Sequence, residues 1–425
     1  MKEYYLDSIA TTPVKWEVLK EMIPYFSLKY HNPSSIYGIE QHKLINEAKD
    51  SVRKLLIGHS NYVFNDMGKP IDDNVIFTSG GSEANSMVIR GFYEKCMHDV
   101  VTPVLVTTPM EHESIQGAYR ELLDLYWYEI PVDAEGFIWL DELRKILSLV
   151  DEHHRRDYRC LVSIQTANNE IGTIQNIPEI ANYVKTFEFQ TNAEYYFHTD
   201  ATQGIPHIDF SVWLDEMKDI DALTFSGHKI GAPKGIGVLY IKDRLPVTPM
   251  IFGTQMDGLR GGTENVPYIV GLKKAIEMID VNRFDTQDGF KSDLMYELLH
   301  NFNLRFNSKL SPRFLPNVLN FTFMGNDRVD TQALVLMLSL NGIYASTGSA
   351  CHESLPVRKP SRVLTAIGLT EEDSYATLRL SWDKDFEEEN KNEEDIKAIV
   401  NRIAKCIYVI QSEEAKEVIN DEEDT

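Results

Sequence analysis

A lysine follows directly on a short apolar stretch near the middle of the chain. The run Ala222–Phe225 is β-prone, and it ends in the sequence Ser226-Gly227-His228-Lys229. A buried strand that stops in small residues places the next side chains at the carboxyl edge of a sheet, where open α/β folds form their ligand crevices. A partly desolvated lysine there can act as an amine nucleophile and typically forms a Schiff base with a carbonyl cofactor. Taken alone, the motif is more typical of a surface lysine in a glycine-rich turn.

A carboxylate and an amide follow another candidate strand. Asp200 comes directly after Tyr195–Thr199, and Gln203 lies one turn further along the chain. A carboxylate buried at a strand end needs a partner, and the N–H cation of a ring cofactor would serve. Asp200 followed by Ala-Thr-Gln is also good helix N-cap chemistry, and taken alone it favours the cap.

Two further strand ends offer an anion site and a histidine. Gly81 and Ser82 follow the strand Val75–Thr78 and open a helix, whose free N–H groups and dipole attract anions. His112 follows Val104–Thr108 at the position of a stacking or acid–base residue, although a lone histidine is more often structural. An anion site, a carboxylate, a histidine and a lysine at successive strand ends suit one ligand. That ligand is pyridoxal 5'-phosphate (PLP).

The elements that must position these residues alternate between helix and strand. Helical patterns cover Val14–Ser27 and Gly38–Leu56, and others lie around Ser114–Leu125 and Pro178–Val184. Such alternation predicts an α/β fold with a mainly parallel sheet covered by helices on both faces. The expected strands are Val75–Thr78, Val104–Thr108, Trp127–Pro131, Cys160–Thr166, Tyr195–Thr199, Ala222–Phe225 and Gly237–Ile241.

The pattern changes near Thr263–Tyr268, where long amphipathic helices begin. Strands expected at Val318–Phe323 and Thr377–Trp382 then indicate a smaller α+β domain. We therefore expect a large domain at 14–265, a small domain at 266–412 joined by 1–13, and a disordered acidic tail at 413–425.

Charge and cysteine usage limit the classes of function. The chain of 425 residues has a net charge of −23, which argues against sequence-independent binding to nucleic acid or to anionic membranes. The cysteines Cys96, Cys160, Cys351 and Cys406 show no metal-ligand spacing, so we expect no metal site and a reducing compartment. No apolar run is long enough to span a bilayer and the N-terminus has no signal-peptide core, so we expect a cytoplasmic location.

Several motifs together resemble the cysteine desulfurases, which are fold-type I, class V aminotransferase-like enzymes. The resemblance runs from about Tyr5 to Trp382, and GSAC within TGSAC is specific to the desulfurase branch. It implies a large PLP-binding domain, with a mainly parallel sheet between helices, and a smaller α+β domain. The matching motifs are YLDSIATTP (5–13), HNPSS (31–35), TSGGSEAN (78–85), EH (111–112), NNEIG (168–172), DATQ (200–203), SGHK (226–229), TGSAC (347–351) and LRLSW (378–382).

The resemblance also implies roles around the cofactor ring. Lys229 would hold PLP covalently and later move protons, while Asp200 would pair with the ring nitrogen. His112 would stack on the ring, and Gln203 would hydrogen-bond the ring phenolate. Asn169 would lie close to that phenolate and to the substrate.

The resemblance implies that the remaining residues bind the phosphate, bind the substrate or remove its sulfur. Arg379 would hold the substrate carboxylate as a bidentate partner, and Cys351 would be the nucleophile. The phosphate would be bound by Gly81, Ser82, Ser226, His228 and Thr263, the last of these from the other subunit of a homodimer.

The implied activity is the removal of sulfur from L-cysteine, which gives L-alanine and a persulfide on Cys351. A protein sulfur acceptor, such as an iron–sulfur scaffold, would then receive the sulfur. A selenocysteine lyase, or another PLP-dependent lyase of the same fold, is the enzyme alternative. A non-catalytic scaffold that retains the fold is disfavoured, because Lys229, Asp200, His112, Arg379 and Cys351 are all present.

Overall fold

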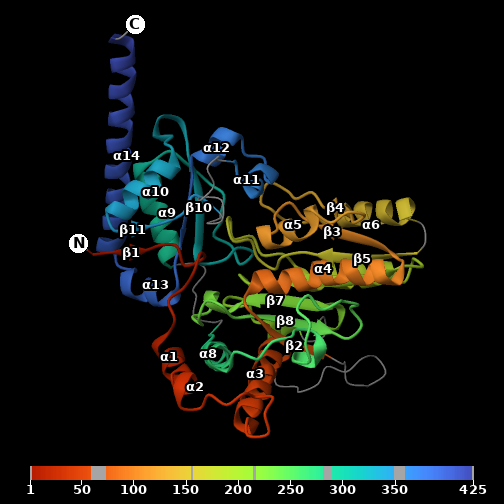
Figure 1. The fold of residues 1–425 in the computed structure, drawn as a ribbon. Helices are drawn as coiled ribbons and strands as arrows, with labels where there is room; N and C mark the ends of the chain where they lie inside the picture. Colours follow the sequence, from red (N-terminus) through yellow and green to blue (C-terminus); the bar gives the residue numbers. More distant parts are fainter. Residues whose placement is uncertain are drawn as a thin grey trace.

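Two bodies of packed secondary structure make up the chain (Figure 1). The computed structural model describes residues 2–58, 73–154, 157–213, 217–280, 289–348 and 359–423. A seven-stranded sheet with its helices forms the larger body, and a three-stranded sheet with its helices forms the smaller one, where both chain termini lie. Within these ranges no helix could cross a membrane, and no group of three or more His, Cys, Asp or Glu side chains could hold a metal ion.

The large sheet has the strand order β2-β8-β7-β6-β5-β3-β4. The strands from β4 to β7 pair in parallel, whereas β8 is antiparallel to both β7 and β2. Every residue of β7 and β8 is buried, so both faces of the sheet are covered there. The strands are β2 (Asp73–Thr78), β3 (Thr102–Thr107), β4 (Tyr126–Glu129), β5 (Tyr158–Ser163), β6 (Glu194–Asp200), β7 (Ala222–Ser226) and β8 (Gly237–Lys242).

Helices pack on this sheet through one apolar side each. Leu143, Leu147 and Val150 recur at helical spacing and form the buried side of α6, which lies against β3. Helix α4 lies against β7 and β8. The helices are α1 (Trp16–Met22), α2 (Pro24–Ser27), α3 (Ile39–Ile57), α4 (Gly81–Asp99), α5 (Glu113–Arg120), α6 (Leu140–His154), α7 (Ile177–Glu188) and α8 (Val266–Glu277), with 3₁₀ turns η1 (Phe210–Trp213), η2 (Met217–Asp219), η3 (Gly227–Lys229) and η4 (Met256–Gly258).

The smaller body is built on an antiparallel sheet of order β12-β10-β9. The N-terminal strand β1 pairs in parallel with β11, and Tyr4 and Leu6 enter the core of this body. Its elements are β1 (Tyr4–Tyr5), α9 (Phe290–Asn301), β9 (Leu304–Phe306), β10 (Val318–Phe323), η5 (Gly325–Asp327), α10 (Thr331–Leu340), β11 (Ile343–Tyr344), α11 (Arg362–Ala366), α12 (Glu371–Tyr375), β12 (Thr377–Ser381), α13 (Lys384–Asn390) and α14 (Glu393–Glu423).

The predicted fold class is confirmed by the mostly parallel sheet and its helices. The predicted domain limits stay a proposal, and the packing of α8 bears on them. Helix α8 contacts α1 and α3, and Ile269, Leu272 and Ala275 belong to the core of the larger body. This packing favours a boundary after Glu277 over the one expected at residue 265. The backbone of α14 continues into the tail for which we expected disorder.

Candidate active site

A pocket of about 260 Å³ opens at the carboxyl ends of β6 and β7, beside the N-termini of α4 and α5. Ten of the twelve predicted site residues line it: Gly81, Ser82, His112, Asn169, Asp200, Gln203, Ser226, His228, Lys229 and Arg379. The strand ends deliver most of them, because parallel strands finish at the same edge of the sheet. Asn85, Ser114, Gln165, Ala167 and Thr202 also line the pocket, together with Ile9 and Ala10.

Lys229 ends the short turn η3 that follows β7. Its ammonium donates to the backbone carbonyls of Ile9 (2.5 Å) and Ala10 (2.7 Å). The N-terminal segment therefore crosses the pocket beside the lysine. Thr12 secures this segment, because its N–H and its hydroxyl both donate to the carbonyl of His228.

Asp200 is the last residue of β6 and is largely buried. One carboxylate oxygen accepts from the side-chain amide of Asn85 at 2.8 Å, and the other accepts from the backbone N–H of Thr202 at 2.9 Å. Hydrogen bonds donated to both oxygens therefore fix the orientation of the carboxylate. The helix-cap alternative for Asp200 is wrong, because the described chain forms a turn and no helix directly after it, and the residue lines the pocket.

His112 is the N-cap of α5, and its Nδ1 accepts from the backbone N–H of Ser114 at 3.1 Å. The Ser114 hydroxyl lies 2.9 Å from the same nitrogen. Histidine is not a usual N-cap, but here it satisfies one of the free N–H groups at the start of the helix. The cap fixes the ring against the wall of the pocket.

The N-terminus of α4 is open toward the pocket. Its N-cap, Gly80, offers no side-chain acceptor, so no cap occupies the N–H groups of the first turn. A Cβ added at Gly81 would lie 3.3 Å from the Thr202 hydroxyl and 3.4 Å from Ser226 Cβ, which leaves little room for a larger residue. His228, on the same side, has its pKa lowered to about 4, mainly by burial and then by the charge of Lys229. It is therefore neutral at pH 7.

Arg379 lies in β12 with only 1% of its surface exposed. It donates through Nη2 to Asp7 at 2.8 Å and through Nη1 to the carbonyl of Asn169 at 2.9 Å. Its Nε is buried, and among the described residues it has no hydrogen-bond partner. Asp7 and the Asn169 carbonyl thus occupy both terminal nitrogens that the expected bidentate carboxylate would use.

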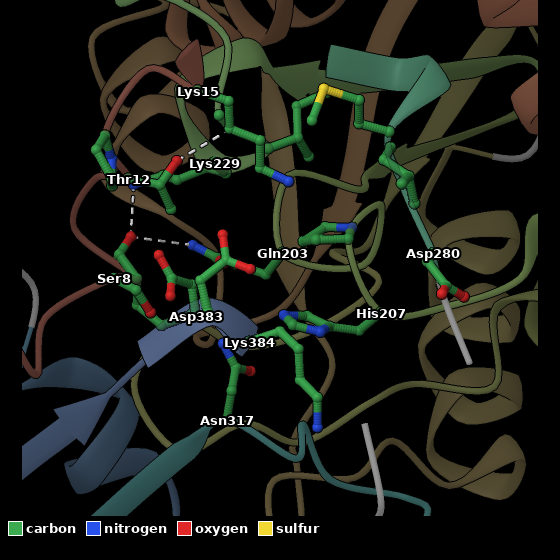
Figure 2. A pocket seen from close by; sticks show the side chains of 18 residues that line it. Ser8, Thr12, Lys15, Gln203, His207, Lys229, Asp280, Asn317, Asp383 and Lys384 are labelled. Carbon is green, nitrogen blue, oxygen red and sulfur yellow. Dashed lines mark hydrogen bonds between the residues drawn. The ribbon is translucent and has the colours of Figure 1, made fainter. Parts of the chain in front are cut away.

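A second cavity of about 110 Å³ lies behind the lysine (Figure 2). It shares Ile9, Gln203 and Lys229 with the first pocket, so these residues separate the two spaces. His207, Asp383 and Lys384 stand around it (Figure 2). Burial lowers the pKa of His207 to about 3, and burial raises the pKa of Asp383.

Two predicted site residues remain. Thr263 is exposed and lies outside the lining of the pocket. Cys351 lies outside the described residues. Sequence reasoning missed Asn85, whose signal was its place four residues after Gly81, on the same side of the helix.

Comparisons with a family model and with curated relatives indicate the same family. The family model described as Aminotransferase class-V matches residues 4–390. A cysteine desulfurase IscS of Clostridium botulinum is 36% identical over 422 residues, covering 96% of this chain and 94% of that one. The cysteine desulfurase IscS of Methanosarcina thermophila is 37% identical over 394 residues, covering 89% of this chain and 87% of its own.

Solved structures agree with these relatives. A NifS-like protein superposes with a TM-score of 0.78 at 30% identity, covering 96% of this chain and all of the other. A NifS-like protein from Rickettsia africae gives a TM-score of 0.76 at 27% identity, with the same coverage. The chain belongs to the cysteine desulfurase family of class-V aminotransferases.

Proposed function

We propose that this chain is a PLP-dependent cysteine desulfurase. It would take the sulfur of L-cysteine, release L-alanine and leave a persulfide on Cys351. The reaction balances without an external oxidant, because the C–S bond of the substrate is replaced by a C–H bond while the Cys351 thiol becomes S–SH. The observation that carries the proposal is the convergence of Lys229, Asp200, His112 and Arg379 on one pocket.

The residues around the pocket fit PLP. The cofactor needs an amine, an anion partner for its ring nitrogen, a flat neighbour for its ring and donors for its phosphate. Lys229, Asp200 and His112 are of the types needed for the first three, and the uncapped start of α4 with Gly81, Ser82, Ser226 and His228 is of the type needed for the last. Bound PLP supplies an aldehyde and an electron-withdrawing ring that delocalises negative charge developing on the substrate Cα.

The chain's own groups would bind the substrate and move its protons. Arg379 would receive the substrate carboxylate through its terminal nitrogens, in exchange for their bonds to Asp7 and the Asn169 carbonyl. Lys229, once released from the cofactor, would carry protons between the substrate carbons. Gln203 and Asn169 would orient the ring phenolate and the substrate. Cys351 would attack the substrate sulfur as a thiolate.

The proposal includes a homodimer with shared sites. Several large apolar side chains of segment 14–39 are exposed, among them Trp16, Phe26, Ile36 and Ile39, and Phe252 is exposed near Thr263. A group of exposed apolar residues on one segment is typical of a protein–protein interface. Thr263 of each subunit would then complete the phosphate site of the other.

A protein acceptor, such as an iron–sulfur scaffold, would receive the sulfur. We also propose a reducing, cytoplasmic setting, which is supported by the free thiols of Cys96, Cys160 and Cys406.

The test uses purified full-length chain with PLP and L-cysteine. The wild type should show a visible absorbance band from bound cofactor and release alanine and persulfide sulfur in equal amounts. Lys229→Ala should lose the band and all turnover, while Lys234→Ala, at an exposed lysine nearby, should keep both. If borohydride still fixed the cofactor to the Lys229→Ala chain, another lysine would be the attachment point.

A second variant separates a desulfurase from a lyase. Cys351→Ala should bind L-cysteine with an unchanged spectral response, because binding needs no thiol. It should form no persulfide and release alanine about a thousandfold more slowly or worse. Undiminished turnover of L-cysteine by this variant would contradict the proposed role of Cys351. Retained turnover of L-selenocysteine alone would favour the selenocysteine lyase.

A further inference from the structure

Asn85 lines the pocket from the second turn of α4, with 1% of its surface exposed. Its side-chain amide has two N–H donors, and both are used. One donates to Asp200 at 2.8 Å and the other donates to the Ser114 hydroxyl at 2.9 Å. One buried amide therefore contacts both the carboxylate of Asp200 and the residue that holds the His112 ring.

Two buried hydroxyls and a histidine ring form a chain of hydrogen bonds that fixes the orientation of this amide. The Asn85 carbonyl oxygen accepts from the Thr224 hydroxyl at 2.5 Å. Thr224 Oγ1 lies 3.1 Å from Nε2 of His198, and His198 Nδ1 lies 2.9 Å from the Ser163 hydroxyl. Burial lowers the pKa of His198 to about 4, so its ring is neutral at pH 7.

The direction of every bond in this chain follows from these contacts. The Thr224 hydroxyl has one proton and donates it to Asn85. Its contact with His198 must therefore be one in which Thr224 accepts, so the His198 proton is on Nε2. His198 Nδ1 then accepts the proton of Ser163. All donors thus point one way, from Ser163 through His198, Thr224 and Asn85 to Asp200, which is the final acceptor.

The second branch sets the tautomer of His112. The Ser114 hydroxyl accepts from Asn85, so its own proton is available to His112 Nδ1. The backbone N–H of Ser114 donates to the same nitrogen. With two donors directed at Nδ1, the neutral ring carries its proton on Nε2.

We propose that Asn85 is a positioning residue that orients Asp200 as a hydrogen-bond acceptor and holds His112 as the Nε2–H tautomer. Resting on the proposed PLP site, the inference adds that one amide prepares both of the residues that would meet the cofactor ring. Thr224 and His198 act behind Asn85 by fixing which way its amide points.

The test measures cofactor affinity and the tautomer of His112 on the full-length chain. Asn85→Leu keeps the size of the residue and removes every bond, and it should weaken PLP binding by about tenfold to a hundredfold, since bonds to a charged group are lost. In ¹⁵N-histidine NMR, the His112 ring should change from a single Nε2–H form to a mixture of tautomers. Thr224→Val should shift both readouts in the same direction by less, and Thr224→Ser, which keeps the hydroxyl, should restore them.

Thr107→Val is the matched control. Thr107 is equally buried on β3, and its hydroxyl has no hydrogen-bond partner among the described residues, so affinity and tautomer should stay at wild-type values. Wild-type PLP affinity and an unchanged His112 tautomer in Asn85→Leu would overturn the inference. If Asn85→Leu does not fold, Thr224→Val decides by the same two readouts. A wild-type chain that binds no PLP would instead refute the proposed function.

Discussion

At the scale of single residues, burial sets the protonation state of Glu111, which precedes His112 in the chain. Its Oε1 accepts from the Thr108 hydroxyl at 2.8 Å and from the Gln165 N–H at 3.0 Å, while Oε2 is buried and has no partner among the described residues. Burial raises the pKa of Glu111 to about 8, and the charge of Asp200 adds to this. The carboxyl is therefore protonated in the folded chain at neutral pH.

This protonation predicts a pH dependence of stability. The unfolded chain ionises Glu111 near pH 4.5, whereas the folded chain does so near pH 8. The contribution of Glu111 to stability is therefore complete below about pH 4.5 and is lost as the pH rises to about 8, by up to about 1.4 kcal/mol per pH unit. Glu111→Gln mimics the protonated form and should remove this loss. Urea unfolding at pH 5.5 and pH 8 measures the difference.

Glu94→Gln serves as the control, because Glu94 is on α4 and exposed to water. Between pH 5.5 and pH 8, the free energy of unfolding of the Glu94→Gln variant should fall by as much as that of the wild type. If Glu111→Gln also matched the wild type, Glu111 would be ionised in the folded chain at neutral pH, contrary to its burial.

The sequence predicted which strand-end residues lie at the pocket better than it predicted the residues that they bond. Lys229, Asp200 and His112 each follow an apolar run, and that rule placed them on one pocket. The partner of Arg379 is Asp7, which is 372 residues away, and no local pattern reveals such a contact. Asn85 escaped notice because its role depends on Asp200 and Ser114, which lie on separate elements.

At the scale of elements, two glycines bring β8 against the loop before α4. Gly237 begins β8 and is paired with Thr78 at the end of β2. A Cβ at Gly237 would lie 2.4 Å from the carbonyl carbon of Gly80, which is the N-cap of α4. The absence of a side chain at Gly237 therefore allows the α4 N-terminus to sit beside the pocket.

We predict that Gly237→Ala weakens PLP binding by about tenfold. The added methyl group must displace the backbone at Gly80 and with it the first-turn N–H groups of α4, at a cost of about 1–3 kcal/mol in stability. PLP titration and thermal unfolding measure the two effects.

Gly117→Ala provides the comparison, since the nearest atom to its added Cβ is Glu113 Oε1 at 3.8 Å. That change lies in α5 and should leave PLP affinity unaltered while stabilising the helix by about 0.5–1 kcal/mol. Equal PLP affinity in both variants would contradict the role given to Gly237.

Strands were predictable where both faces of the sheet are buried, because such strands have continuous apolar sequences. The runs Ala222–Phe225 and Gly237–Ile241 correspond to β7 and β8, each of which extends one residue further. The helix expected around Pro178–Val184 corresponds to α7, which ends only at Glu188. The amphipathic pattern of α8 is compatible with packing on either body, so the sequence pattern did not show which body it joins. Its packing on α1 and α3 depends on contacts that are distant in sequence.

At the scale of the whole molecule, the proposed dimer implies that one subunit alone leaves its phosphate site incomplete. Thr263 is exposed and absent from the lining of its own pocket, and several large apolar side chains of segment 14–39 face solvent. A twofold symmetric dimer would cover an apolar surface of each subunit and exchange the two threonines. Each active site would then need residues from both chains.

Mixed dimers test this exchange directly. Lys229→Ala and Thr263→Asp should each be inactive alone, the latter because its carboxylate would repel the phosphate. A hybrid of the two has one site with both residues intact, so random mixing should restore up to about a quarter of wild-type activity. Lys229→Ala mixed with Arg379→Ala should restore none, because both residues line the pocket of the same chain and every hybrid site is damaged. No recovery of activity in the Lys229→Ala plus Thr263→Asp mixture, or a fully active monomer in sedimentation, would show that each chain completes its own site.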